Sequence, residues 1–120
     1  ISGQLPLWEG KLEYSGTVGQ DLSLEEGKKA AQLCALNILA QLKEACAGDW
    51  NRVTGCLRLG GFVCSSDDFK DHPQVINGAS DLMVAVFGEQ GRHARAAVGV
   101  NALPLEAAVE VEALFEVTAS

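Results

Sequence analysis

At 120 residues, 48% of them hydrophobic, the chain is long enough for one globular domain with its own core. Its formal net charge of −7 disfavours binding to the phosphate backbone of nucleic acids, and no cluster of lysine or arginine compensates for that charge. No apolar run approaches the ~20 residues that cross a bilayer, and no signal-peptide pattern is present, so we expect no membrane partner and a cytoplasmic protein.

The first part of the chain predicts extended structure and then a long helix. Residues 1–7 are expected to form a strand, residues 8–11 a turn and residues 12–14 a short extended piece. A capping box at residues 23–26 then begins a helix that ends near Cys46. Apolar residues at steps of three and four give this helix one buried face: Ala31, Cys34, Ala35, Ile38, Leu42 and Ala45.

The middle of the chain predicts a buried strand and a second helix. Residues 53–64 are rich in glycine and large apolar residues, which is typical of a strand covered by a helix, and their glycines indicate a bulge or a close backbone approach. Asp71 is expected to cap the second helix, with Pro73 in its first turn and Gly88 at its end. The order of elements predicts an α+β fold, a mixed sheet with two helices on one face.

Two further strands are expected at the C-terminal end. In residues 94–100 the alternation places Arg95 on one face beside two very small side chains, where its guanidinium should line a cavity and be mostly desolvated. Residues 109–117 alternate as well, with Glu110 and two other glutamates on one face. If the two strands pair as a hairpin, the arginine and these carboxylates share a face.

Three stretches of the sequence resemble the Rid (YjgF-like) family of imine/enamine deaminases. They are ARAAVGVNALP followed by VEVEA, the segment Ser2-Gly3-Gln4-Leu5-Pro6, and the Val75-Ile76-Asn77 start of the second helix. This resemblance covers nearly the whole chain as a single domain over residues 1–120. It implies a chorismate-mutase-like fold that assembles as a homotrimer, with three clefts between subunits and the open face of the sheet buried. Members of the family carry a further strand before SGQ, which is missing from this sequence.

The resemblance also implies a reaction and a set of site residues. Members hydrolyse reactive 2-imino acids or their enamine tautomers to 2-oxo acids and ammonia, without a metal or cofactor. Arg95 corresponds to the family arginine, whose planar guanidinium offers two parallel donors to a substrate carboxylate. Glu110 aligns with the residue that orients or activates the attacking water. By the same analogy, Gly3 offers backbone groups to the ligand and Asn77 reaches a neighbouring subunit's cleft.

Each of these residues also has a structural interpretation. Arg95 could pair with Glu112 on the neighbouring strand, and Glu110 could be a solvated strand carboxylate. Gly3 and Asn77 could serve only a turn and a helix surface. The alternative function is a homotrimer that binds a small carboxylate, in a regulatory role for example, and catalyses nothing. A ribonuclease activity is disfavoured by the negative charge and by the lack of a histidine pair.

Sulfur chemistry is not expected in this protein. Many Rid deaminases have a cysteine where this chain has Ala97, which excludes thiol chemistry at that position. The four cysteines, Cys34, Cys46, Cys56 and Cys64, show neither a CxxC motif nor a Cys/His spacing for a metal. We therefore predict buried free thiols.

Overall fold

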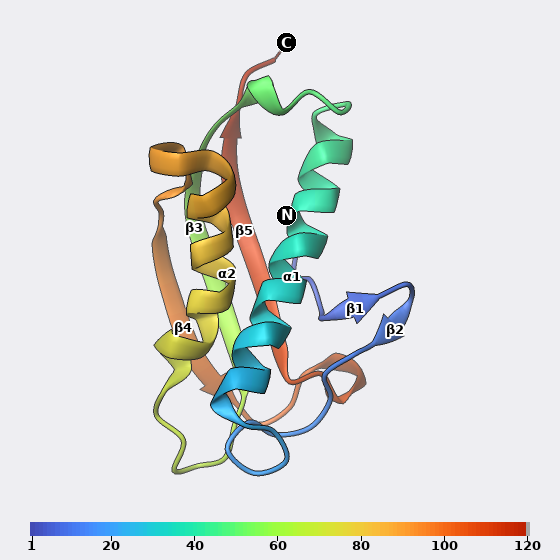
Figure 1. Cartoon of the computed structure of the whole chain (residues 1–120), viewed down its shortest axis with the longest axis vertical. Helices are drawn as coiled ribbons and strands as arrows, with labels where there is room; N and C mark the ends of the chain where they lie inside the picture. The colour runs from blue at the N-terminus through green and yellow to red at the C-terminus, as the bar shows by residue number, and fades with distance from the viewer. Residues whose placement is uncertain (120) are drawn as a thin grey trace.

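A computed structural model describes residues 1–119 and shows two helices lying side by side on one face of a three-stranded sheet (Figure 1). The α-helices are α1 (Leu24–Ala45) and α2 (His72–Phe87), the strands are β1 (Leu7–Trp8), β2 (Lys11–Leu12), β3 (Val53–Cys64), β4 (Ala94–Val100) and β5 (Val109–Val117), and the short 3-10 helices are η1 (Trp50–Arg52), η2 (Gly88–Gly91) and η3 (Pro104–Glu106). The predicted α+β class and the helices on one face are confirmed.

The order of strands in the main sheet is β4-β3-β5. Strand β3 pairs parallel with β4 and antiparallel with β5. The predicted hairpin between β4 and β5 is therefore wrong, although both strands have the predicted bounds. Strand β3 takes the central position because α2 connects it to β4 by a β-α-β crossover, which makes the two strands parallel neighbours.

The N-terminal segment forms less regular strand than expected. Residues 1–7 were predicted as one strand, but only two of them have strand pairing: Gln4, which bridges to Val111 of β5, and Leu7, which begins β1. The N-terminal amino group of Ile1 also donates to the carbonyl of Ala113, at 2.8 Å. This segment thus extends along the free edge of β5. The small β1–β2 hairpin projects to one side of the molecule, with its predicted turn at residues 8–11 (Figure 1).

Both helices begin close to where the sequence predicts. Ser23 and Glu26 form the expected capping box, with hydrogen bonds of 3.0 and 3.1 Å between each side chain and the other residue's backbone amide. Asp71 precedes α2 as its N-cap but makes no side-chain capping bond. The face of α1 that was predicted to be buried is buried as far as Leu42. Ala45, the last residue of the helix, is exposed.

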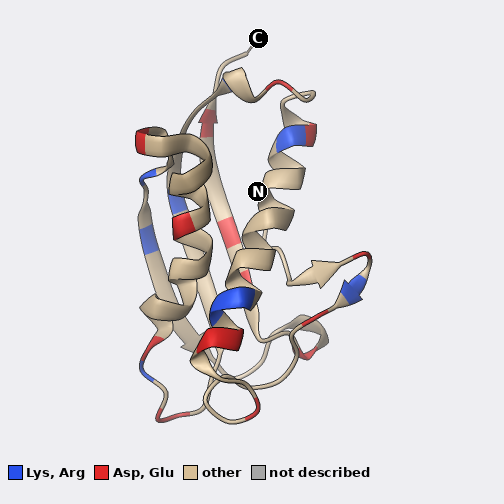
Figure 2. Cartoon of the chain, viewed as in Figure 1, with Lys and Arg blue, Asp and Glu red and all other residues tan. Residues whose placement is uncertain are grey.

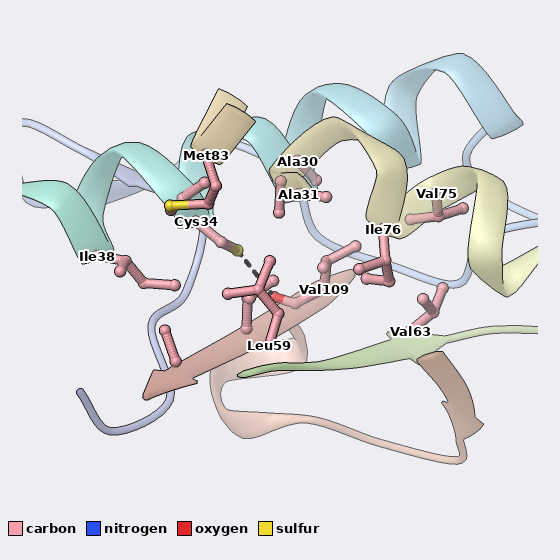
Figure 3. Close-up of a cluster of buried hydrophobic side chains, with 14 of the residues drawn as sticks. Ala30, Ala31, Cys34, Ile38, Leu59, Val63, Val75, Ile76, Met83 and Val109 are labelled. Carbon is pink, nitrogen blue, oxygen red and sulfur yellow. Dashed lines mark hydrogen bonds between the residues drawn. The ribbon is translucent and has the colours of Figure 1, made fainter. Parts of the chain in front are cut away.

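A single main core lies between the helices and the sheet (Figure 3). The thiol of Cys34 points from α1 toward β5 and donates to the backbone carbonyl of Val109 at 3.6 Å. Leu59 of β3 and Ile76 and Met83 of α2 are fully buried around it. The four cysteines are buried and free, as predicted.

Glycines let the layers approach closely. A Cβ atom on Gly61 of β3 would lie 2.5 Å from the side chain of Ile76, so only glycine leaves room for α2 at this point. A Cβ atom on Gly78 would overlap the backbone carbonyl oxygen of Lys28, where α2 crosses α1. The expected irregularity of β3 is also present, as register shifts against β5 on either side of Cys56.

The face of the sheet opposite the helices carries exposed apolar side chains. Val98 of β4 is 45% exposed and Leu114 of β5 is 56% exposed. Between them Arg58 and Glu112 form an ion pair at 3.2 Å. Among residues 1–119, no helix is long and apolar enough to cross a membrane. In the view of Figure 2 the basic segments are scattered over several elements, among them α1, β2 and β4.

Replacing Gly78 with alanine should destabilise the protein by about 1–3 kcal/mol, because the new methyl group meets a backbone oxygen that can move only with its helix. The higher helix propensity of alanine, about 1 kcal/mol, offsets part of this cost. Gly55→Ala is the control, since its Cβ would have no contact closer than 3.7 Å. Chemical denaturation measures both free energies of unfolding, and equal stability of the two variants would contradict the close helix crossing.

Candidate functional site

Arg95 lies on β4, the edge strand beneath α2. It pairs in register with Leu59, whose side chain is fully buried in the core, so Arg95 faces the helical layer. Its Nη1 donates to Asn77 Oδ1 at 2.7 Å and to Ser80 Oγ at 3.1 Å. Asn77 and Ser80 are three residues apart on α2 and therefore occupy the same side of the helix. The helix thus holds one end of the guanidinium in place.

The rest of the guanidinium is available to a ligand. The two bonds use both hydrogens of Nη1, which leaves the Nε and Nη2 hydrogens along the other edge of the planar group. Arg95 is exposed in the single chain, contrary to the expected desolvation. Among residues 1–119 its guanidinium forms no ion pair. Glu112, the predicted structural partner, lies on the other face of the sheet and pairs with Arg58.

Ser80 links Arg95 to His93. The Ser80 Oγ lies 2.8 Å from His93 Nε2, and His93 Nδ1 lies 2.6 Å from the backbone carbonyl oxygen of Gly91. These side chains belong to the lining of a shallow hollow of about 260 Å³. Six residues line it: Asn77, Ser80, Val84, Arg92, His93 and Arg95. Two arginines and a histidine therefore meet at one place on an acidic protein, which makes the hollow suited to an anion.

Glu110 lies on the other face of the sheet. It pairs in register with Phe62, which in turn is opposite Val98 on the face away from the helices. The expectation that Arg95 and Glu110 share a face is wrong. Two strand spacings also separate them, about 10 Å, because β3 lies between their strands. Within one chain, the two side chains cannot contact the same small ligand.

Gly3 and Glu110 are close neighbours. A Cβ atom on Gly3 would overlap Glu110 Oε2 and would lie 2.8 Å from the carboxyl carbon. The absence of a side chain at this position is what leaves room for the carboxylate. The four residues named from the sequence therefore form two pairs, Arg95 with Asn77 and Gly3 with Glu110, on opposite sides of the sheet.

Ser80 and His93 were not identified as site residues from the sequence. Two spacings contained the signal, since Ser80 follows Asn77 by three residues on a helix and His93 precedes Arg95 by two residues on an extended segment. Each spacing puts its two residues on the same side of the element.

A second histidine occupies a separate hollow. His72 Nε2 lies 3.0 Å from Ser65 Oγ, in a hollow of about 250 Å³ at the C-terminal ends of β3 and β4. Gly99 makes space for this contact, because a Cβ there would lie 2.5 Å from His72 Nε2. The two histidines therefore do not form a pair. No group of three side chains suited to hold a metal ion occurs within residues 1–119.

The thiols are poorly placed for catalysis. Burial, with a smaller contribution from the negative charge of Glu110, raises the pKa of the Cys34 thiol far above its ordinary value. Burial raises the pKa of Cys56 to about 11. Since the thiolate is the reactive form, neither group is a nucleophile near neutral pH.

Comparison with known proteins assigns the chain to a family. Residues 1–117 match the family described as "YjgF/chorismate mutase-like, putative endoribonuclease". The chain belongs to the Rid (YjgF-like) family. Protein TCP17 of Trypanosoma cruzi is 49% identical over 117 residues, which are 97% of this chain and 72% of TCP17.

Solved structures place this Rid protein within the fold. The protein Atu1372 of Agrobacterium tumefaciens, described as of unknown function, is 48% identical and superposes with a TM-score of 0.97, over 98% of this chain and 75% of its own. RidA of the Antarctic bacterium Psychrobacter sp. PAMC 21119 is 29% identical, with a TM-score of 0.60 over 98% and 78% of the two chains. The predicted chorismate-mutase-like fold is confirmed.

Proposed function

We propose that this Rid protein hydrolyses reactive 2-imino acids, or their enamine tautomers, to 2-oxo acids and ammonia. Membership of the family supports a Rid-type function, and the surroundings of Arg95 support a substrate with a carboxylate. The reaction takes place in a cytoplasmic homotrimer, and it uses no metal or cofactor. Its chemistry is intrinsically easy, so that binding and orientation supply much of the rate enhancement.

The observation that carries this proposal is the anchored guanidinium of Arg95. Asn77 and Ser80 hold Nη1, so the group does not have to be ordered when a ligand arrives. Its free edge presents Nε–H and Nη2–H side by side, the geometry that binds both oxygens of a carboxylate. A 2-imino acid bound in this way lies on the side of the guanidinium opposite the Nη1 atom that Asn77 and Ser80 hold.

Glu110 reaches the substrate from a neighbouring subunit. Because Arg95 and Glu110 lie on opposite faces of the sheet in one chain, a site that contains both needs two copies of the chain. The Gly3–Glu110 pair of one subunit then completes the hollow at Arg95 of the next, and Glu110 orients the attacking water. Exposed Val98 and Leu114 supply apolar surface for this contact between copies.

A binding-only function has one observation in its favour. The carboxylate receptor at Arg95 is complete within a single chain, whereas the group proposed to handle water is absent from that side of the sheet. A protein without catalysis would bind 2-oxo acids and leave the hydrolysis of imines at its uncatalysed rate. A ribonuclease would instead cleave RNA after stringent purification, which the charge of −7 disfavours.

Light scattering at micromolar concentration should give three times the chain mass of 12.6 kDa. Leu114→Glu should weaken this assembly, because it puts a charge in the apolar part of the open sheet face. Leu36→Glu is the matched control on the outer side of α1, where the wild-type residue is 42% exposed, and it should remain trimeric. A stable wild-type monomer would contradict the shared site.

Arg95→Lys should lose most deaminase activity and most affinity for 2-oxo acids, because lysine keeps the charge but not the two parallel donors. Each charge-assisted hydrogen bond contributes about 1.5–3 kcal/mol, so the loss of one weakens binding about 10- to 100-fold. Calorimetric titration with pyruvate gives the affinity. The rate of 2-oxo acid formation is measured in an assay that generates the 2-imino acid in the reaction mixture, and the uncatalysed rate is subtracted.

Arg52→Lys serves as the control in both measurements, since the Arg52 side chain donates to a backbone carbonyl, that of Thr118, rather than to a group in the hollow. Wild-type affinity for pyruvate in the Arg95→Lys protein would mean that Arg95 is structural. Tight binding of pyruvate by the wild type without any acceleration of hydrolysis would instead support the binding-only function.

A further inference from the structure

We propose that Asn37 of α1 is a positioning residue for the deamination reaction, because it holds the N-terminal segment (residues 1–7) where Gly3 sets the position of Glu110. This inference rests on the proposed deaminase function and adds to it a residue that was not among the site residues predicted from the sequence. Asn37 acts through the backbone of the segment and not by contact with the substrate.

The side-chain amide of Asn37 is fully used in holding the segment. Its Nδ2 donates to the backbone carbonyl oxygens of Leu5 and Leu7, each at 2.9 Å. A carbonyl oxygen can only accept, so the amide nitrogen and not Oδ1 must face the segment, and both of its hydrogens are used. Asn37 is half-buried and directly precedes the fully buried Ile38, which places it at the flank of the buried face of α1.

The two bonds from Asn37 lie on either side of a sharp turn. The amide of Leu7 donates to the carbonyl of Leu5 at 2.8 Å, which closes a γ-turn around Pro6. Pro6 is fully buried, and its ring fixes φ in the range that this turn uses. At this turn the chain leaves the edge of β5 and enters β1. Because Gly3 is two residues from Leu5, the position of the turn limits the position of Gly3.

The carboxylate of Glu110 depends on this segment for its position. Among residues 1–119 it forms no hydrogen bond or ion pair. Its Oε2 lies against Gly3, where an added Cβ would overlap it. Between Gly3 and the turn, one bridge holds the chain on β5, in which Gln4 and Val111 exchange backbone hydrogen bonds of 2.8 and 3.1 Å. A turn released from α1 therefore displaces Gly3 and leaves the carboxylate free to move.

Substitutions at Asn37 can remove or reverse its donors. Asn37→Leu keeps the approximate size of the side chain without a donor, and Asn37→Asp puts a negative charge in front of two carbonyl oxygens. Both should lower kcat by about 10- to 100-fold, because a displacement of about 1 Å in a site can cost about 10²-fold. Gln32→Leu and Gln32→Glu make the corresponding changes at an exposed position of the same helix and should keep wild-type kcat.

The affinity for pyruvate separates a positioning role from general support of the fold. Arg95 and Asn77 lie on the opposite side of the sheet from Gly3 and Glu110. Asn37→Leu should therefore keep the affinity within about threefold of wild type while its kcat falls. Equal losses of kcat and affinity would mean that Asn37 supports only the fold, and would overturn the proposal.

A double variant tests whether Asn37 acts through Glu110. Glu110→Gln alone should lower kcat by about 10²-fold or more, the loss typical of an acid/base group. Adding Asn37→Leu to it should lower kcat by less than about twofold further, because a residue that acts only by positioning this carboxylate has no separate effect once the carboxylate is gone. Losses that multiply would show that the two residues act independently and would overturn the proposal.

Hydrogen exchange tests the contact without any turnover. The Val111 amide donates to the carbonyl of Gln4 at 3.1 Å, and its exchange should be about tenfold faster in Asn37→Leu, roughly the factor that one lost hydrogen bond accounts for. The Cys64 amide, which donates to Ala108 at 2.8 Å, is the reference and should exchange as in the wild type.

Two results would overturn the proposal while the deaminase function stands: unchanged exchange at Val111, or wild-type kcat in a folded Asn37→Leu protein. No turnover by the wild type would instead remove the deaminase function, and the role of Asn37 in catalysis with it, which is a distinguishable result.

Discussion

The position of Arg95 depends on two hydrogen bonds from one nitrogen atom. Nη1 is held by Asn77 and Ser80, two residues one turn apart on α2, and α2 is held against β4 by the packing of Ile76 and its neighbours into the core. Because Gly61 lets α2 approach the sheet, the helix reaches the edge strand closely enough to bind its arginine. The packing of the helix on the sheet thus sets the orientation of the free edge of the guanidinium.

The central position of β3 explains why Arg95 and Glu110 lie apart within one chain. A hairpin of β4 and β5 would have placed Arg95 beside the glutamates, but β3 separates the two strands and the faces of their side chains differ. The connection between β4 and β5 instead passes the end of β3. Glu110 therefore belongs to the open face of the sheet, together with Gly3, whose missing side chain makes room for the carboxylate.

Local signals in the sequence predicted the elements well, because each depends on residues close together in the chain. The Ser23–Glu26 capping box, the Asp71 start of α2 and the alternation in β4 and β5 all gave correct elements. The pairing of strands depends on contacts between distant residues and was wrong for β4 and β5. The contacts of Ser80 with His93 and Arg95 also join separate elements, so they could be recognised only once α2 and β4 were placed side by side.

The most direct test of a site shared between subunits is complementation of two inactive variants. Arg95→Lys and Glu110→Gln proteins would be unfolded together, refolded as mixed trimers and assayed for hydrolysis of a 2-imino acid. If each cleft takes Arg95 from one subunit and Glu110 from a neighbour, random mixing in equal amounts leaves about a quarter of the clefts with both wild-type residues. Recovery of about a quarter of wild-type activity is the expected result. Mixed trimers as inactive as the two parent variants would contradict the account.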